Sequence, residues 1–135
     1  MDCAEARARF AAARVARLAT VRADGTPHLV PIVFTLRGDT VYSAVDDKPK
    51  RTRTLARLAH VADNPAVSLL ADHYEDDWSA LWWARGDGLG RVLAPDDPEA
   101  RAAVGLLAQR YPQQQGAGAV LAVDVTRWSG WAASG

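Results

Sequence analysis

Residues 17–34, RLATVRADGTPHLVPIVF, carry the clearest structural signal in the chain. Two stretches rich in β-branched and apolar residues flank the tight turn Ala23-Asp24-Gly25, a pattern typical of a β-hairpin. A second turn at residues 37–39 precedes the β-forming sequence TVYSAV. We therefore expect an opening antiparallel meander of three strands, over residues 15–22, 26–36 and 40–45.

Helices and further strands are expected on both sides of this meander. Residues 3–14 are strong helix formers, and Asp2 is a suitable N-cap. Two more helices are expected, from about residue 52 to the segment before Pro65 and from Pro98 to about residue 111. The remaining strands are expected over residues 66–71, 79–92 and 119–128. Six or more short strands with inserted helices indicate a mainly β fold with flanking helices, built as a small antiparallel barrel.

The composition is that of one domain covering residues 1–135. Sixteen basic and sixteen acidic residues cancel, so net charge gives no support to a polyanion-binding protein. No apolar run is long enough to span a membrane, and the polar, alanine-rich start differs from a secretory signal. Cys3 is the only cysteine, which excludes an internal disulfide. We expect a soluble cytoplasmic protein without a membrane partner.

Residues 73–83, HYEDDWSALWW, combine acidic residues with three tryptophans. Because neighbouring strand residues point to opposite faces, Trp82 and Trp83 cannot enter the same core layer. The face of Trp82 continues with small residues up to Gly90, which leaves room for another backbone or a flat ligand. We expect a second subunit to cover one indole, since tryptophan concentrates at interfaces. The alternative is one tryptophan in the core and one simply exposed.

Residues 48–57, KPKRTRTLAR, place five cations around the start of the expected second helix. Helix amides, arginine forks and lysines together favour a phosphate or a longer anionic tail. A solvated basic helix end is the alternative interpretation. Nucleic acid is a weaker one, because no DNA- or RNA-binding motif is present.

With these features in view, the chain resembles the flavin and deazaflavin split-barrel family. This family includes pyridoxamine 5'-phosphate oxidases and oxidoreductases that use the deazaflavin coenzyme F420. The resemblance covers about residues 15–92, and five segments carry it: RLATVRADGTPHLVPIVF (17–34), TVYSAV (40–45), KPKRT (48–52), DNPAVSLL (63–70) and DHYEDDWSALWW (72–83). The combination of the last segment with KPKRT is similar to a branch classed as F420 users.

The resemblance implies a homodimer of split β-barrels with two cofactor sites at the subunit interface. The cofactor ring would lie against Val30, Pro31, Ile32, Val33 and Ser43. Its phosphate tail would reach Lys50, Arg51, Thr52 and Arg57. The partner chain would contribute Trp78, Trp82 or Trp83. The implied reaction is hydride transfer between coenzyme F420 and a small unsaturated substrate.

Alternatives to this assignment stay open. The RxVLLK-like strand and the SRK string of FMN-dependent pyridoxamine-phosphate oxidases are absent, yet FMN is not excluded. A non-catalytic carrier of flavin, deazaflavin or haem is a further alternative. The surplus of cations favours F420, whose tail carries a phosphate and several glutamates. No catalytic residue can be assigned, although Tyr42, Tyr74 and His73 are candidate proton donors, and the histidines lack the spacing of metal ligands.

Overall fold

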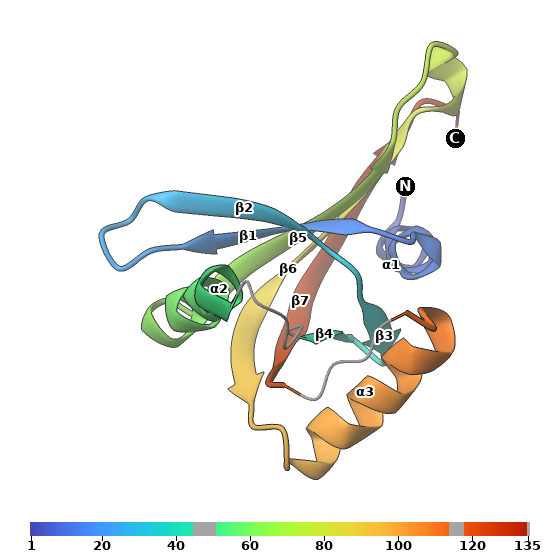
Figure 1. Ribbon diagram of the computed structural model, residues 1–135. Helices are drawn as coiled ribbons and strands as arrows, with labels where there is room; N and C mark the ends of the chain where they lie inside the picture. Colours follow the sequence, from blue (N-terminus) through green and yellow to red (C-terminus); the bar gives the residue numbers. More distant parts are fainter. Residues whose placement is uncertain (45–50, 114–117, 135) are drawn as a thin grey trace.

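The computed structural model describes residues 1–44, 51–113 and 118–134, and for residues 51–55 the backbone alone. Within these ranges, three α-helices surround a strongly curved sheet (Figure 1). The helices are α1 (Cys3–Ala12), α2 (Arg51–Asp63) and α3 (Pro98–Arg110), together with the short 3-10 helix η1 (Trp78–Ala80). The strands are β1 (Ala16–Val21), β2 (Pro27–Ile32), β3 (Thr35–Arg37), β4 (Thr40–Ala44), β5 (Ala66–His73), β6 (Trp82–Leu93) and β7 (Val120–Ala132).

All neighbouring strands pair antiparallel in one seven-stranded sheet with the order β2-β1-β5-β6-β7-β4-β3. Helix α1 packs against β6 and β7, α2 against β1 and β6, and α3 against β3 and β4. This arrangement confirms the expected mainly β fold with flanking helices, and its open, curved sheet is that of a split barrel. The expected N-cap is also confirmed, because the Asp2 carboxylate accepts a hydrogen bond from the Glu5 amide at 2.8 Å.

The expected three-strand meander is wrong in one respect. The stretch expected as one strand over residues 26–36 forms two strands, β2 and β3, which lie at opposite edges of the sheet. Phe34 lies between them, fully buried with its ring centroid 4.6 Å from that of Phe10. Its carbonyl accepts a hydrogen bond from Arg110 of α3 at 3.0 Å. The chain therefore leaves one edge through the core and joins the other edge under α3.

A half-exposed network of charges joins α3 to the sheet. The Arg91 guanidinium donates to both oxygens of Glu99, at 2.8 and 2.7 Å, and to both oxygens of Asp124, at 2.7 and 3.1 Å. The Tyr42 hydroxyl donates to Glu99 at 2.6 Å. Hydrogen bonds from Arg91 and then from Tyr42 lower the pKa of Glu99 to about 2. Glu99 thus holds the start of α3 against β4, β6 and β7.

We expect Glu99→Gln to lower the free energy of unfolding at neutral pH by about 1 kcal/mol, because solvent weakens charge-assisted bonds in a group this exposed. The ordinary pKa of 4.5 is depressed in the folded state, so the stabilisation is present above pH 4.5 and is lost as pH falls towards about 2. Urea unfolding measured between about pH 2 and pH 4.5 should show that the free energy of unfolding of the variant changes less with pH than that of the wild type. The exposed neighbour Asp96 supplies the control Asp96→Asn, and equal slopes for Glu99→Gln and wild type would contradict the assignment.

Candidate functional site

The two adjacent tryptophans of β6 lie on opposite faces of the sheet, as expected. Trp82 packs against the hydrophobic core, and the Arg9 guanidinium of α1 lies over its ring at 5.5 Å. Trp83 lies on the outer face, which no described helix covers, and the Arg85 guanidinium lies 5.5 Å from its ring centroid. Both indoles are partly buried, and Trp83 is the one that lines a hollow on the outer face.

The small-residue face below Trp82 does not leave room for a ligand. A Cβ added to Gly88 would lie 2.2 Å from the Asp124 carbonyl oxygen of β7. One added to Gly86 would meet Trp128 at 3.0 Å, and one added to Gly90 would meet Val61 of α2 at 2.8 Å. Of the two occupants expected on this face, another backbone or a flat ligand, the structure bears out the first, because the β7 backbone and α2 of the same chain occupy the space.

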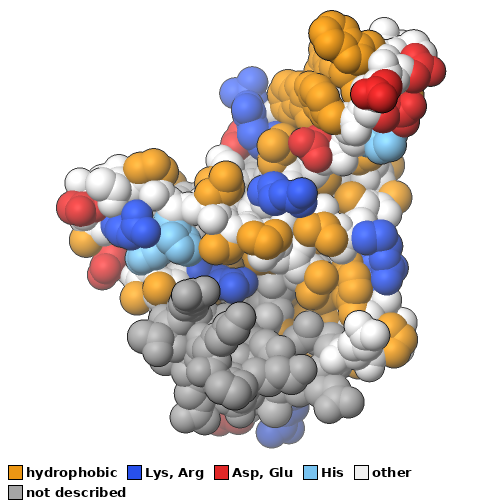
Figure 2. All heavy atoms as spheres, turned by 45° about the horizontal axis from the view of Figure 1, so that its top comes forward, with side chains coloured by type: hydrophobic (Ala, Val, Ile, Leu, Met, Phe, Trp, Pro, Cys, Tyr) orange, Lys and Arg blue, Asp and Glu red, His pale blue; other side chains and the backbone are white. Residues whose placement is uncertain are grey.

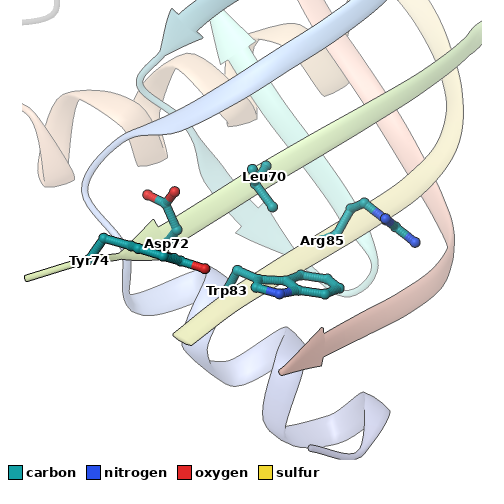
Figure 3. Close-up of a pocket in the computed structure, with 5 residues that line it drawn as sticks. All are labelled: Leu70, Asp72, Tyr74, Trp83 and Arg85. Carbon is teal, nitrogen blue, oxygen red and sulfur yellow. The ribbon is translucent and has the colours of Figure 1, made fainter. Parts of the chain in front are cut away.

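On the outer face, five side chains line a hollow of about 400 Å³ that we call the aromatic slot (Figure 3). Its residues are Leu70, Asp72, Tyr74, Trp83 and Arg85. They share a face because they occupy alternate positions, and the strand register pairs Leu70 with Arg85 and Asp72 with Trp83. Figure 3 shows Tyr74 directed towards Trp83, and Arg85 extending away from Asp72 and Tyr74.

The slot lies at the base of a projecting arm formed by residues 73–81 and the end of β7 (Figure 1). Figure 2 shows hydrophobic and acidic side chains gathered at this end of the molecule. Trp78 is 76% exposed and Tyr74 is 63% exposed. Asp77 caps η1 by accepting from the Ser79 amide at 3.1 Å, and His73 pairs with Glu75. The arm is thus an ordered element that presents aromatic rings and negative charge to solvent.

A second hollow, of about 510 Å³, lies on the outer face between β1, β5 and β6. Ala19, Val21 and Leu89 contribute apolar surface to it. Leu89 is 53% exposed, and Leu29 of the edge strand β2 is 68% exposed. Exposed aliphatic side chains concentrated on one sheet face are typical of an interaction surface.

On the inner side, α2 and the β1–β2 hairpin form a cationic corner made of Arg22, His28, Arg57 and His60. The rings of His28 and His60 lie edge to face, with centroids 4.8 Å apart. His60 also links α2 to β1, because its Nδ1 lies 3.2 Å from the buried Thr20 hydroxyl. Among the described residues, His28 Nδ1 and Arg57 Nε are buried without a hydrogen-bond partner.

The electrostatics of the cationic corner suit an anion. Burial lowers the pKa of His28, and the positive charges of His60, Arg22 and Arg57 lower it further. Burial also lowers the pKa of the Arg57 guanidinium. The unpartnered Arg57 Nε–H and the positive charge of Arg22 and Arg57 are what an incoming phosphate or carboxylate would satisfy. Arg57 is therefore placed where it could bind an anionic group.

The other residues expected at a cofactor ring differ in accessibility. Ile32 and Ser43 are buried, Val30 and Val33 are partly buried, and Pro31 is exposed. Strand β2 lies at the sheet edge, where proline is tolerated. Lys50 lies outside the described residues, and of Arg51 and Thr52 the structure gives the backbone alone, at the start of α2. Of the residues expected to bind the phosphate tail, Arg57 is the one whose side-chain surroundings the structure describes.

The three candidate proton donors also lie apart. The Tyr42 hydroxyl is bound to Glu99 under α3, and burial together with this bond raises the pKa of Tyr42, so its proton is firmly held. His73 is paired with Glu75 on the arm, and Tyr74 lines the aromatic slot. Of the three candidates, Tyr74 is the one whose side chain lines a hollow that a ligand could enter.

Sequence reasoning missed two groupings. Thr20 and His28 are paired across β1 and β2, but His60 joins them from a helix far along the chain. Asp72 and Arg85 enter the aromatic slot through the β5–β6 register. The alternation of residues 70, 72 and 74 was a usable signal, whereas the contact between His28 and His60 depends on how α2 packs.

Within the described ranges, no group of three or more His, Cys, Asp or Glu side chains is arranged to hold a metal ion. None of the described helices is both long enough and apolar enough to cross a membrane.

The family model described as pyridoxamine 5'-phosphate oxidase matches residues 4–132. No curated protein matches the chain significantly.

Among solved structures, an FAD-binding protein from Mesorhizobium loti is similar with a TM-score of 0.73 and 20% identity, covering 96% of this chain and 94% of that one. The FAD-binding protein from Mycobacterium smegmatis has a TM-score of 0.68 and 21% identity, covering 97% and 94%. HutZ, the haem storage protein from Vibrio cholerae, has a TM-score of 0.72 and 15% identity, covering 98% and 95%. At such identities the likeness establishes the fold.

We expect His28→Gln to flatten the pH dependence of stability in mildly acidic solution. His28 is neutral in the folded state, and its pKa is lowered from 6.5, so the unfolded chain takes up a proton first and stability falls as pH drops below 6.5. Thermal unfolding at neutral pH and at about pH 5 would measure this difference. His73→Gln, on the exposed arm, is the matched control. An unchanged slope in His28→Gln would show that His28 is not the titrating group.

Proposed function

Because the chain belongs to the pyridoxamine 5'-phosphate oxidase family of split barrels, we propose that it is a deazaflavin-dependent oxidoreductase that uses coenzyme F420. The observation that carries this proposal is the cationic corner, with Arg57 Nε and His28 Nδ1 lacking partners among the described residues. Two of its residues, Arg57 and His60, lie on α2, whose first turn overlaps the cation-rich residues 48–53. This quantity of positive charge suits a long tail of phosphate and carboxylates better than a single phosphate.

When bound, F420 supplies hydride transfer to or from a small unsaturated substrate. In this proposal, Arg57 and the cations before it bind the tail and fix the direction of the cofactor. The partly buried Val30, which shares a face of β2 with His28, supports one side of the ring together with the partly buried Val33, whereas the exposed Pro31 points to the opposite face of β2. The protein contributes by orienting the cofactor against the substrate and by excluding water from the site, and such positioning accounts for much of the rate in reactions of this kind.

The proposal includes a homodimer with cofactor sites at the subunit interface. The exposed Leu29 and Leu89 and the hollow between β1, β5 and β6 are the surface that a second copy would cover. The arm, which carries the exposed Trp78, would reach the partner's cofactor site together with Trp83. Trp82 takes part less directly, since its indole packs in its own chain against the core.

A second candidate function is non-catalytic binding of a flavin or haem, or FMN-dependent oxidation. It is favoured by the similar structures that are described as FAD-binding proteins and as a haem storage protein. Absorbance and fluorescence titrations of the purified chain with F420, FMN, FAD and haemin would separate these ligands. Oxidation of reduced F420 by enones and quinones in the presence of the protein would then separate an enzyme from a carrier. Tight binding of FMN or haemin with no response to F420 would overturn the proposal.

We expect Arg57→Gln to weaken F420 binding roughly 10- to 100-fold, because one charge-assisted contact is lost. The double variant Lys50→Ala, Arg51→Ala should weaken it further. Fluorescence titration of F420 measures both effects. Arg101→Gln, which removes an exposed arginine from α3, is the control and should bind as wild type does. Equal affinity in all four proteins would remove the cationic corner from the cofactor site.

The dimer can be tested independently of any cofactor. We expect Leu89→Asp, which places a charge on the outer face, and Trp83→Ala to shift the protein towards monomer in sedimentation experiments. Val92→Asp, at an exposed site further along β6, is the comparison. A wild-type chain that sediments as a monomer at high concentration would contradict the dimer.

A further inference from the structure

The aromatic slot has an unbalanced charge. Arg85 is paired with Asp87 at 3.2 Å, and Asp87 also accepts from the Ser68 hydroxyl at 2.6 Å. The Asp72 carboxylate has no hydrogen-bond or ion-pair partner within the described part of the chain, although it faces the same hollow. The positive charge of the slot is therefore already neutralised, while one negative charge is left free.

The aromatic rings of the slot, like the negative charge of Asp72, attract cations. Trp83 and Tyr74 present aromatic surface beside Asp72 (Figure 3). The face of an aromatic ring is electronegative and attracts cations, with tryptophan the strongest in this respect. Glu75, Asp76 and Asp77 of the neighbouring arm add negative potential. The Arg85 guanidinium already lies 5.5 Å from the Trp83 ring centroid, and the Asp72 carboxylate, the Tyr74 ring and the surrounding field favour a further positive ligand.

Other occupants fit the slot less well. An anion at Arg85 would compete with Asp87 and would approach a surface dominated by acids. A neutral apolar group would remove Asp72 from water without giving it a partner, which is unfavourable. A volume of about 400 Å³ suits one or two fused rings rather than a large ligand.

We propose that the aromatic slot binds a small planar organic cation, such as an N-alkylated or protonated heteroaromatic ring. The ring stacks against Trp83 and Tyr74, and its positive end lies at Asp72. Leu70 forms the apolar base between the two strands. This site lies on the opposite face of the sheet from the cationic corner. It shares Trp83 with the subunit interface proposed above, and the experiment below separates a small cation from a second copy of the chain as its occupant.

Three probes of nearly equal size isolate the role of charge: 1-methylnicotinamide as the cation, nicotinamide as the neutral ring and nicotinate as the anion. Ligand-observed NMR and isothermal titration calorimetry on the full chain would measure their affinities. We expect the cation to bind roughly tenfold more tightly than nicotinamide, and nicotinate to bind most weakly. Asp72→Asn should remove this preference for the cation and leave nicotinamide binding unchanged.

Asp76→Asn is the matched control, because it removes a charge of the arm that does not line the slot, and it should retain the preference. Tyr74→Leu, at an exposed position, should weaken the binding of all ring ligands. The proposal is overturned if nicotinate binds as well as the cation, if Asp76→Asn has the same effect as Asp72→Asn, or if no probe binds. Should Asp72→Asn instead weaken self-association, the slot holds a cationic side chain of a second copy, and the ligand proposal is wrong. F420 titration is not involved, so the proposed function stands or fails separately.

Discussion

The close approach of β7 and α2 to strand β6 is the constraint on which the two candidate sites depend. It is possible because Gly86, Gly88 and Gly90 leave the inner face of β6 without side chains. A methyl group at Gly88 would collide with the backbone of β7, and one at Gly90 would push against Val61 of α2. Since Arg57 and His60 lie on the same helix as Val61, this contact also determines where the cationic corner forms.

The same strand separates two chemically different surfaces. Its inner side is filled by the core and by α2, whose polar residues meet the β1–β2 hairpin. Its outer side carries Trp83 and Arg85 into the aromatic slot. Positive charge is thus collected under the sheet and negative charge on the projecting arm, although the whole chain is electrically neutral. Net charge alone would have concealed both surfaces.

Local features of the fold could be predicted from the sequence because short-range chemistry determines them. The β1–β2 hairpin, the Asp2 cap, the end of α2 before Pro65 and the opposite directions of Trp82 and Trp83 all depend on neighbouring residues. The separation of β2 from β3 could not be predicted, because it depends on the burial of Phe34 against Phe10 and on Arg110. Within the site, Arg57 was expected, whereas its neighbours His28 and His60 meet only after α2 has packed.

Strand β2 ends the sheet with proline at both Pro27 and Pro31. Each proline lacks the amide hydrogen that a newly added strand would need, so this border is a poor template for fibrils or for continuous intermolecular sheets. The two prolines therefore disfavour the pairing of a second chain with the edge strand β2.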